Sequence, residues 1–379
     1  MTPAGRNGSA VGACDPCLRR MALVARLAPY IERIATGVPG ARSPELLGLP
    51  DADLVRAVAG QKARELLAAD PPLDLPALRA RLRAAGCWSV CRHHPAYPVG
   101  LLDAGDAPPA LAGLGDPGLL GRLDPDACVT VVGARRATPS GEGVARDLAA
   151  GLAAAGLVVV SGMANGIDSA AHRGALGAGG ISVAVLGTGP DIAYPQRQRR
   201  LHADLRERGL VLAELPAGAR AFRWCFPARN RILAALARLT IVVEAAERSG
   251  SLITAQLAAD LGRDIGAVPG PVTSPLSGGS NALLADGAAV VRDAQDALDA
   301  LLGPGRPAVE QVGPPLDPAA AAALDQLERG LVSADAIASG SGREASEVAA
   351  ALARLELYGY AERDIAGRWW RTTLHAPER

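Results

Sequence analysis

The sequence "CVTVVGARRATPSGEG" (Cys128–Gly143) joins an apolar run of strand length to a glycine-containing turn and the start of a helix. The run is continuously apolar rather than alternating, which is typical of a strand buried on both faces of a sheet. Similar runs, separated by helical segments, follow along the chain: "LVVVSG", "ISVAVLG", "LVLAEL", "LTIVVEAA", "DIGAVPG" and "AAVVRD". This order predicts parallel strands joined by right-handed helical crossovers.

The chain divides into four predicted regions. Residues 87–303 are predicted to form an α/β fold with an extended Rossmann-like, doubly wound and mainly parallel sheet. The segment at the start of this region is predicted to add peripheral structure to the edge of the sheet. Residues 1–86 read as a small helical domain, in which the turn Gly37–Gly40 is typical either of a connector or of a DNA-binding helix pair. Residues 304–318 form a Pro- and Gly-rich linker, and residues 319–379 have the helix and strand order of a winged helix.

The composition favours a folded protein, because 49% of its 379 residues are hydrophobic. The formal net charge is zero, so an anionic partner must be met by local clusters of positive charge. We expect a cytoplasmic protein without a membrane partner, since the sequence has no signal-peptide order and no apolar run of membrane-spanning length.

The six cysteines are scattered, which fits reduced thiols rather than a disulfide framework. Cys14 and Cys17 have the spacing of a metal or redox pair, but no second ligand pair lies near them in the sequence. We therefore expect neither a metal nor a cofactor.

In an open parallel sheet, ligands bind beyond the carboxyl ends of the strands. After the first strand, Gly133 permits a tight turn, Arg135 supplies a guanidinium, and Ser140–Gly141 begin a helix whose free N–H groups favour an anion. The spacing differs from a dinucleotide-binding motif, and Ser161–Gly162 stand where an acidic ribose-binding residue would end the next strand. A dinucleotide cofactor is therefore not expected.

The other strand ends also carry small, polar or basic residues. Ser161–Gly162 and Gly166 follow the second strand and suit a phosphate oxygen, while Ser249–Ser251 follow the fifth strand at a helix amino terminus. After the fourth strand comes "FRWCFPARNRILAALA" (Phe222–Ala237), which gathers three aromatic residues beside Arg229–Arg231 in a chain with only 3% aromatic residues. The strand ends indicate binding more than catalysis.

Several motifs resemble, in order and spacing, the DprA/Smf family of DNA-processing proteins. They are "VTVVGARRATPSGEG", "VVVSGMANGIDSAAH", "VAVLGTGPDIAYP", "AELPAG", "FPARNRILAALA", "VVEAAERSGSLITAQLAADLGRDIGAVPG" and "GGSNALLADGA". The linker and winged helix are also similar to those of many members, whereas the amino-terminal helices match only loosely.

The resemblance implies a protein without enzymatic activity that binds single-stranded DNA as a recombination mediator. Such a protein protects incoming DNA during natural transformation in competent cells, loads the RecA recombinase in place of single-strand-binding protein, and forms dimers through its Rossmann-like domain. Two positions depart from the family pattern, since Asn165 stands where a basic residue is frequent and Ser140 where an aromatic is frequent. The implied DNA-binding residues are Gly133, Arg135, Ser161, Gly162, Gly166, Arg229, Asn230, Arg231, Ser249, Gly250 and Ser251.

An alternative hypothesis is a nucleotide-binding Rossmann-like enzyme that hydrolyses a glycosidic or phosphate bond. Asp168, Glu214 and Glu244 are the carboxylates that would act as acid or base, unless they cap helices or bond within loops. His172 reads as a packed or surface helix residue, and no catalytic residue is assigned.

Helical geometry separates the two arginines of the aromatic-rich stretch. A spacing of two residues places Arg229 and Arg231 about 200° apart around a helix. We therefore expect Arg229 to face DNA and Arg231 to brace the loop or a dimer.

The winged helix has a third helix of mixed charge, so a protein-contact or dimer role is an alternative to reading a DNA groove. Of its two adjacent tryptophans, we expect Trp369 in the wing and Trp370 in the core.

Overall fold

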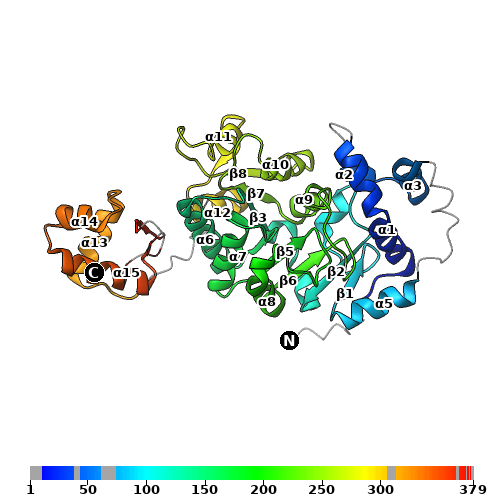
Figure 1. The fold of residues 1–379 in the computed structure, drawn as a ribbon, viewed down its shortest axis with the longest axis horizontal. Helices are drawn as coiled ribbons and strands as arrows, with labels where there is room; N and C mark the ends of the chain where they lie inside the picture. The colour runs from blue at the N-terminus through cyan, green and yellow to red at the C-terminus, as the bar shows by residue number, and fades with distance from the viewer. Residues whose placement is uncertain are drawn as a thin grey trace.

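The centre of the molecule is a nine-stranded sheet with the order β1-β2-β6-β5-β4-β3-β7-β8-β9 (Figure 1). This computed structural model describes residues 11–37, 43–60, 74–304, 313–363, 367–372, 374 and 376. The predicted apolar runs all form parallel strands: β3 (Cys128–Val132), β4 (Val158–Ser161), β5 (Ser182–Leu186), β6 (Leu210–Ala213), β7 (Leu239–Val242), β8 (Asp264–Ala267) and β9 (Ala289–Val290).

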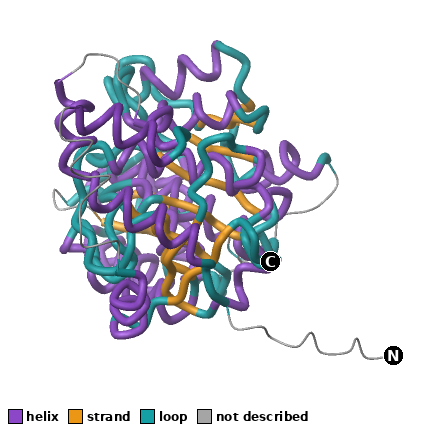
Figure 2. Tube along the Cα trace, turned by 90° about the vertical axis from the view of Figure 1, so that its right-hand side faces the viewer, coloured by secondary structure: helices purple, strands orange, loops and turns teal. Residues whose placement is uncertain are grey.

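Helices cover both faces of this sheet (Figure 2). Val158 and Val160 of β4 pack with Ile232 on one face, whereas Val159 packs with Leu148 on the other. Both faces are therefore buried, which explains why these strands are continuously apolar. The helices are α6 (Pro139–Ala154), α7 (Ile167–Gly177), α8 (Arg199–Arg208), α9 (Cys225–Leu236), α10 (Gly250–Asp260), α11 (Gly278–Ala285) and α12 (Ala294–Leu302).

Two antiparallel strands, β1 (Trp88–Cys91) and β2 (Ala110–Gly115), extend the sheet beside β6. The indole of Trp88 covers Gly113, where a Cβ would lie only 2.3 Å from the ring, and its Nε1 donates to the Gly115 carbonyl at 2.8 Å. The peripheral structure predicted before the first parallel strand is thus this antiparallel edge. Short 3₁₀ helices are η2 (Val99–Asp103), η3 (Pro117–Arg122), η4 (Pro125–Ala127) and η5 (Gln196–Gln198).

The amino-terminal segment is helical, as predicted, with α1 (Asp15–Gly37), α2 (Ser43–Leu47), α3 (Asp51–Ala59) and α5 (Leu75–Ala84). Apolar side chains of α1 form a core with α3 and with Trp224, Cys225 and Ala228 at the start of α9. Residues 38–42 lie outside the described residues, and with them most of the predicted Gly37–Gly40 turn.

The carboxyl-terminal segment has the predicted order of a winged helix, with α13 (Pro318–Glu328), α14 (Ala334–Ser341), α15 (Ala345–Tyr358), β10 (Ala361–Arg363) and β11 (Trp369–Arg371). The prediction for the two tryptophans is wrong, because Trp369 is buried among α13–α15 and Trp370 is partly exposed beside Arg368. Most of the predicted linker, residues 305–312, lies outside the described residues. Among the helices that are described, none is long and apolar enough to cross a lipid bilayer.

Candidate nucleic-acid interface

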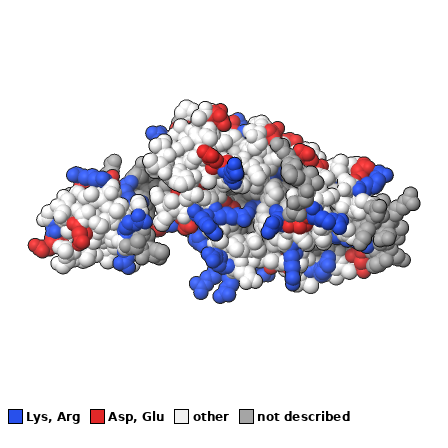
Figure 3. Space-filling model, turned by 45° about the horizontal axis from the view of Figure 1, so that its top comes forward, with Lys and Arg blue, Asp and Glu red and all other residues white. Residues whose placement is uncertain are grey.

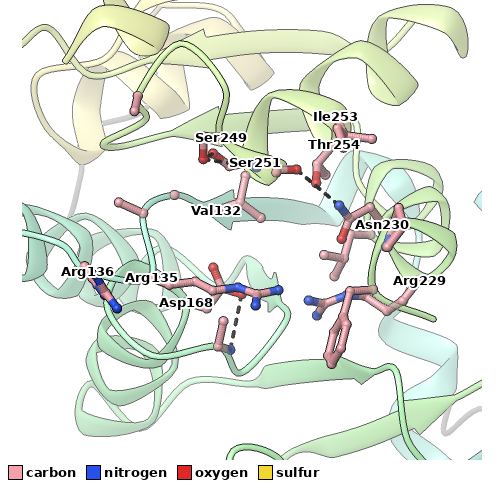
Figure 4. A pocket seen from close by; sticks show the side chains of 18 of the residues that line it. Val132, Arg135, Arg136, Asp168, Arg229, Asn230, Ser249, Ser251, Ile253 and Thr254 are labelled. Atoms are coloured by element: carbon pink, nitrogen blue, oxygen red, sulfur yellow. Dashed lines mark hydrogen bonds between the residues drawn. The ribbon is translucent and has the colours of Figure 1, made fainter. Parts of the chain in front are cut away.

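A pocket of about 390 Å³ lies at the carboxyl ends of β3 and β7, between α9 and the start of α10 (Figure 4). This is the position where open parallel sheets bind their ligands. The predicted residues that line it are Gly133, Arg135, Arg229, Asn230, Ser249, Gly250 and Ser251. The predicted residues that do not line it are Ser161, Gly162, Gly166 and Arg231.

Arg229 reaches the pocket from the first half of α9. Its side chain is only 6% exposed, and its Nη1 donates a hydrogen bond to the Val185 carbonyl at 2.7 Å. A Cβ at position 162 would lie 1.7 Å from Nη1, so the glycine there makes room for the guanidinium. Arg229 Nε has no hydrogen-bond partner among the described residues. The guanidinium therefore keeps donor capacity beyond the hydrogen bond that positions it.

Asp168, in the first turn of α7, places a buried carboxyl group near Arg229. One of its oxygens accepts a hydrogen bond from the Ala164 N–H at 3.3 Å. Burial raises the pKa of the Asp168 carboxyl, and the positive charge of Arg229 opposes that rise. Burial also lowers the pKa of Arg229 to about 10, which leaves the guanidinium charged at neutral pH. Arg135 adds a second guanidinium to the lining, so two basic side chains face one carboxyl group there.

Arg135 and Arg229 point toward one another across the pocket (Figure 4). Arg135 is exposed, and its guanidinium carbon lies 5.2 Å from the ring centroid of Phe226. Phe226 in turn lies 5.4 Å from the ring of Tyr194, which is 46% exposed. Two guanidinium groups and an accessible aromatic surface thus meet at one place, a combination that suits both phosphates and bases.

The amino terminus of α10 forms another side of the pocket. Ser249 caps this helix, since its Oγ accepts from the Ser251 N–H at 3.3 Å and shares a 2.7 Å hydrogen bond with the Ser251 hydroxyl. Asn230 Nδ2 donates to the Gly250 carbonyl at 3.3 Å, which ties α9 to α10. The helix terminus adds partial positive charge and small hydroxyl donors to the same wall.

Two of the predicted residues outside the lining shape the backbone beneath it. Ser161 is fully buried, and its hydroxyl donates to the Val131 carbonyl at 2.6 Å. Gly166 has a φ of +76°, and a Cβ there would lie 2.3 Å from the Ala134 carbonyl oxygen. A residue without a side chain is therefore needed where α7 begins against the turn after β3.

Arg231 points away from the pocket, on a different side of α9 from Arg229. Its Nη2 and Nη1 bind the two oxygens of Glu214 at 2.7 and 3.1 Å, and its Nε donates to the Asp106 carbonyl at 3.0 Å. The side chain is buried and lies 3.4 Å from the Asp106 carboxylate. Arg231 thus joins α9 to the end of β6 and to the loop before β2.

The start of α6 differs from the sequence prediction of an anion site at Ser140–Gly141. The helix begins at Pro139, and Thr138 caps it. Glu244 accepts hydrogen bonds from the Thr138 N–H at 2.9 Å and from the Thr138 hydroxyl at 2.5 Å. A carboxylate of the protein therefore takes the place expected for an external anion, a role that the sequence could not reveal because the partners are 106 positions apart.

Of the three carboxylates that an enzyme would use, Asp168 lines the pocket, whereas the other two lie outside its lining and have structural partners. Glu214 is held by Arg231, and Glu244 by Thr138. His172 is fully buried, its Nδ1 lies 2.7 Å from the Ser182 hydroxyl, and burial lowers its pKa to about 3. A histidine that stays neutral and away from the pocket is not available for proton transfer there.

The comparisons with known proteins agree with this architecture. Residues 88–302 match the family model described as DNA recombination-mediator protein A, and residues 307–366 match the DprA winged helix domain. The chain belongs to the DprA family. A putative DNA processing protein DprA from Mycobacterium tuberculosis is 45% identical over 278 residues, which cover 70% of this chain and 69% of that protein.

Two solved DprA structures share the fold. The X-ray structure of the Streptococcus pneumoniae protein has a TM-score of 0.60 at 33% identity, and the match covers 75% of this chain and 95% of that one. DNA processing protein A from Helicobacter pylori, solved for its unique single-stranded DNA binding mode, has a TM-score of 0.51 at 29% identity, with 57% and 95% coverage. The predicted DprA-type Rossmann-like sheet and winged helix are thereby confirmed.

The sequence did not predict the aromatic contact beside the pocket. Tyr194 lies in the "PDIAYP" segment after β5, and its ring meets Phe226 of α9 only because this loop folds against the start of that helix. Basic side chains also gather along the middle of one face of the molecule, despite the zero net charge (Figure 3). A protein with zero net charge needs such a local cluster of positive charge to bind an anionic partner.

Proposed function

We propose that this DprA-family protein binds single-stranded DNA in the pocket between β3, α9 and α10. The observation that carries the proposal is the convergence of Arg135 and Arg229 on one pocket, beside the ring of Phe226. Phosphates attract guanidinium groups, and bases stack on aromatic rings whatever their sequence. The guanidinium groups and the aromatic ring together indicate a nucleic-acid ligand better than either feature alone, because a site that binds only phosphate would need no ring.

The predicted site residues take two kinds of role in this proposal. Arg135 and Arg229 contact phosphates, with further donors from Asn230 and from the α10 terminus, Ser249–Ser251. Phe226, supported by Tyr194, offers a stacking surface for a base. The remaining predicted residues position this surface without touching DNA: Gly133, Ser161, Gly162, Gly166 and Arg231.

Preference for single strands follows from the size and shape of the site. A pocket of about 390 Å³ at the end of a sheet admits a phosphate and part of one nucleotide, not the width of a duplex. A base in a single strand also turns toward an aromatic ring without the cost of unpairing. The relative from Helicobacter pylori, described by its single-stranded DNA binding mode, supports this choice of ligand.

The wider role follows from membership of the DprA family. We propose that the protein acts in the cytoplasm as a homodimer, protects single-stranded DNA during natural transformation, and loads RecA in place of single-strand-binding protein. It needs no catalytic activity for this, and the engagement of Glu214 and Glu244 by their partners supports a non-enzymatic function.

Fluorescence anisotropy with a labelled oligothymidylate, over a series of salt concentrations, tests the binding proposal. We expect log Kobs to fall linearly with log[salt], with a slope of about −0.7 for each phosphate contacted, and a much weaker affinity for a duplex of the same length. Affinity that ignores salt, or that is equal for duplex and single strand, would overturn the proposal. RecA filament formation on DNA coated with single-strand-binding protein then tests loading separately.

A further inference from the structure

We propose that Cys14, Cys17, Cys91 and His93 bind one structural Zn²⁺ ion. The three sulfur atoms and one imidazole nitrogen lie within 4.8 Å of one another, although Cys14 and Cys91 are 77 positions apart in the sequence. Three thiolates and one histidine form a frequent ligand set of structural zinc sites. This inference is independent of DNA binding, since the cluster lies outside the pocket lining.

The spacing of the ligand atoms matches a tetrahedral site. Bond lengths of about 2.3 Å to sulfur and about 2.0 Å to nitrogen place two sulfurs about 3.8 Å apart, and a sulfur about 3.5 Å from the nitrogen. The Cys14 and Cys91 sulfurs are 3.8 Å apart. His93 Nδ1 lies 3.3, 3.4 and 4.0 Å from the sulfurs of Cys14, Cys17 and Cys91.

Two separate elements supply the ligands in pairs. Cys14 immediately precedes α1 and Cys17 lies in its first turn, whereas Cys91 ends β1 and His93 follows in the next turn. The Cys14 N–H donates to the Cys91 sulfur at 3.4 Å, a contact that supports a thiolate, as does the positive end of α1. The neighbouring His94 is engaged differently, because its Nδ1 accepts from the Ala96 N–H at 3.1 Å.

The ligand chemistry selects the ion and its role. Soft thiolates with one imidazole in a compact tetrahedral arrangement favour zinc over magnesium or calcium, which prefer oxygen ligands. Four protein ligands close the coordination shell and leave no open position for a substrate. The site is therefore structural rather than catalytic.

The consequence of the site is a fixed attachment of α1 to the edge of the sheet. Further along the same helix, Ala28 accepts a hydrogen bond from Trp224 Nε1 at 3.0 Å, and Glu32 accepts one from the Trp224 N–H at 3.1 Å. Trp224 immediately precedes α9, the helix that carries Arg229. The zinc ion thus holds in place the helix against which the start of α9 packs.

Metal analysis of the full-length protein, purified under reducing conditions from zinc-supplemented cells, tests the proposal. We expect about one zinc per chain in the wild type, and loss of that zinc in Cys17→Ser and His93→Ala. Cys87→Ser is the matched control, because Cys87 is also buried and close in sequence but lies outside the cluster. Circular dichroism establishes that each variant is folded. A wild type without zinc, or equal zinc content in all four proteins, would overturn the assignment.

A second measurement uses the wild type alone and so does not depend on the folding of variants. Chelation under reducing conditions should lower the melting temperature, and Co²⁺ should restore it while producing the sulfur-to-cobalt charge-transfer absorption of a thiolate site. An unchanged melting temperature with no such absorption contradicts the proposal. A disulfide that joins Cys14 to Cys17 or to Cys91 in protein purified under reducing conditions would also contradict the proposal.

Discussion

Two sides of one helix behave differently in this protein. Arg229 and Arg231 are both buried in α9, with 6% and 2% of their surfaces exposed. Arg231 is held by both oxygens of Glu214 and by the Asp106 carbonyl, whereas Arg229 bonds to one carbonyl and faces a pocket that also holds Arg135. Burial alone therefore does not show whether an arginine is structural or binds a ligand. What distinguishes the two is how much of each charge the protein itself neutralises.

The largest effect is expected on the braced side of the helix. Arg231→Met leaves Glu214, whose side chain is only 12% exposed, without its partner, so we expect the free energy of unfolding to fall by about 3–5 kcal/mol in a urea titration. Arg238→Met is the control, because Arg238 also pairs with two carboxylates, Asp126 and Asp264, but is 49% exposed. Its loss should be much smaller, because solvent screens an exposed ion pair. Equal losses for the two variants would remove the distinction between a structural brace and a surface pair.

A smaller effect is expected where the protein makes room for Arg229. Gly162→Ala places a Cβ where Arg229 Nη1 now lies, so the guanidinium must move and lose its bond to Val185. We expect a cost of about 1–3 kcal/mol in unfolding and weaker binding of single-stranded DNA. Gly143→Ala is the matched control, since a Cβ there meets nothing within 4 Å and alanine favours the helix. Normal DNA affinity in Gly162→Ala would show that the position of Arg229 is unimportant.

The aromatic residues at the start of α9 extend the same comparison. Phe226 lies beside Arg135 at the pocket, whereas Phe222 packs against the amino-terminal helices. Phe226→Leu keeps an apolar side chain but removes the ring, and we expect a loss of about 1 kcal/mol, or about fivefold, in affinity for single-stranded DNA. Phe222→Leu should leave that affinity unchanged. Anisotropy titrations that give the same affinity for both variants would argue against stacking on Phe226.

Local patterns were sufficient to predict much of the architecture. Continuous apolar runs gave the parallel strands, and a spacing of two residues separated Arg229 from Arg231 because helical geometry acts within a few positions. The prediction assigned Trp369 and Trp370 to the wrong sides of their strand. A strand of only three residues alternates too briefly for its sequence to define the buried face.

Contacts between distant segments could not be predicted in this way. Glu244 reaches Thr138 from 106 positions away, and the cysteine pair at the start of α1 meets Cys91 and His93 only because α1 packs against the β1–β2 edge of the sheet. Neither arrangement leaves a periodic signal in the sequence. The same holds for Tyr194, whose ring meets Phe226 of α9 from the loop after β5.

The salt dependence of single-stranded DNA affinity in Arg229→Gln and Arg231→Met tests the division of labour between the two arginines most directly. With concentrations corrected for the folded fraction, Arg229→Gln should weaken binding by about tenfold or more and reduce the slope of log Kobs against log[salt] by about 0.7, the value for one lost phosphate contact. Arg231→Met should keep the wild-type slope. Equal changes in slope and affinity for the two variants would contradict the account.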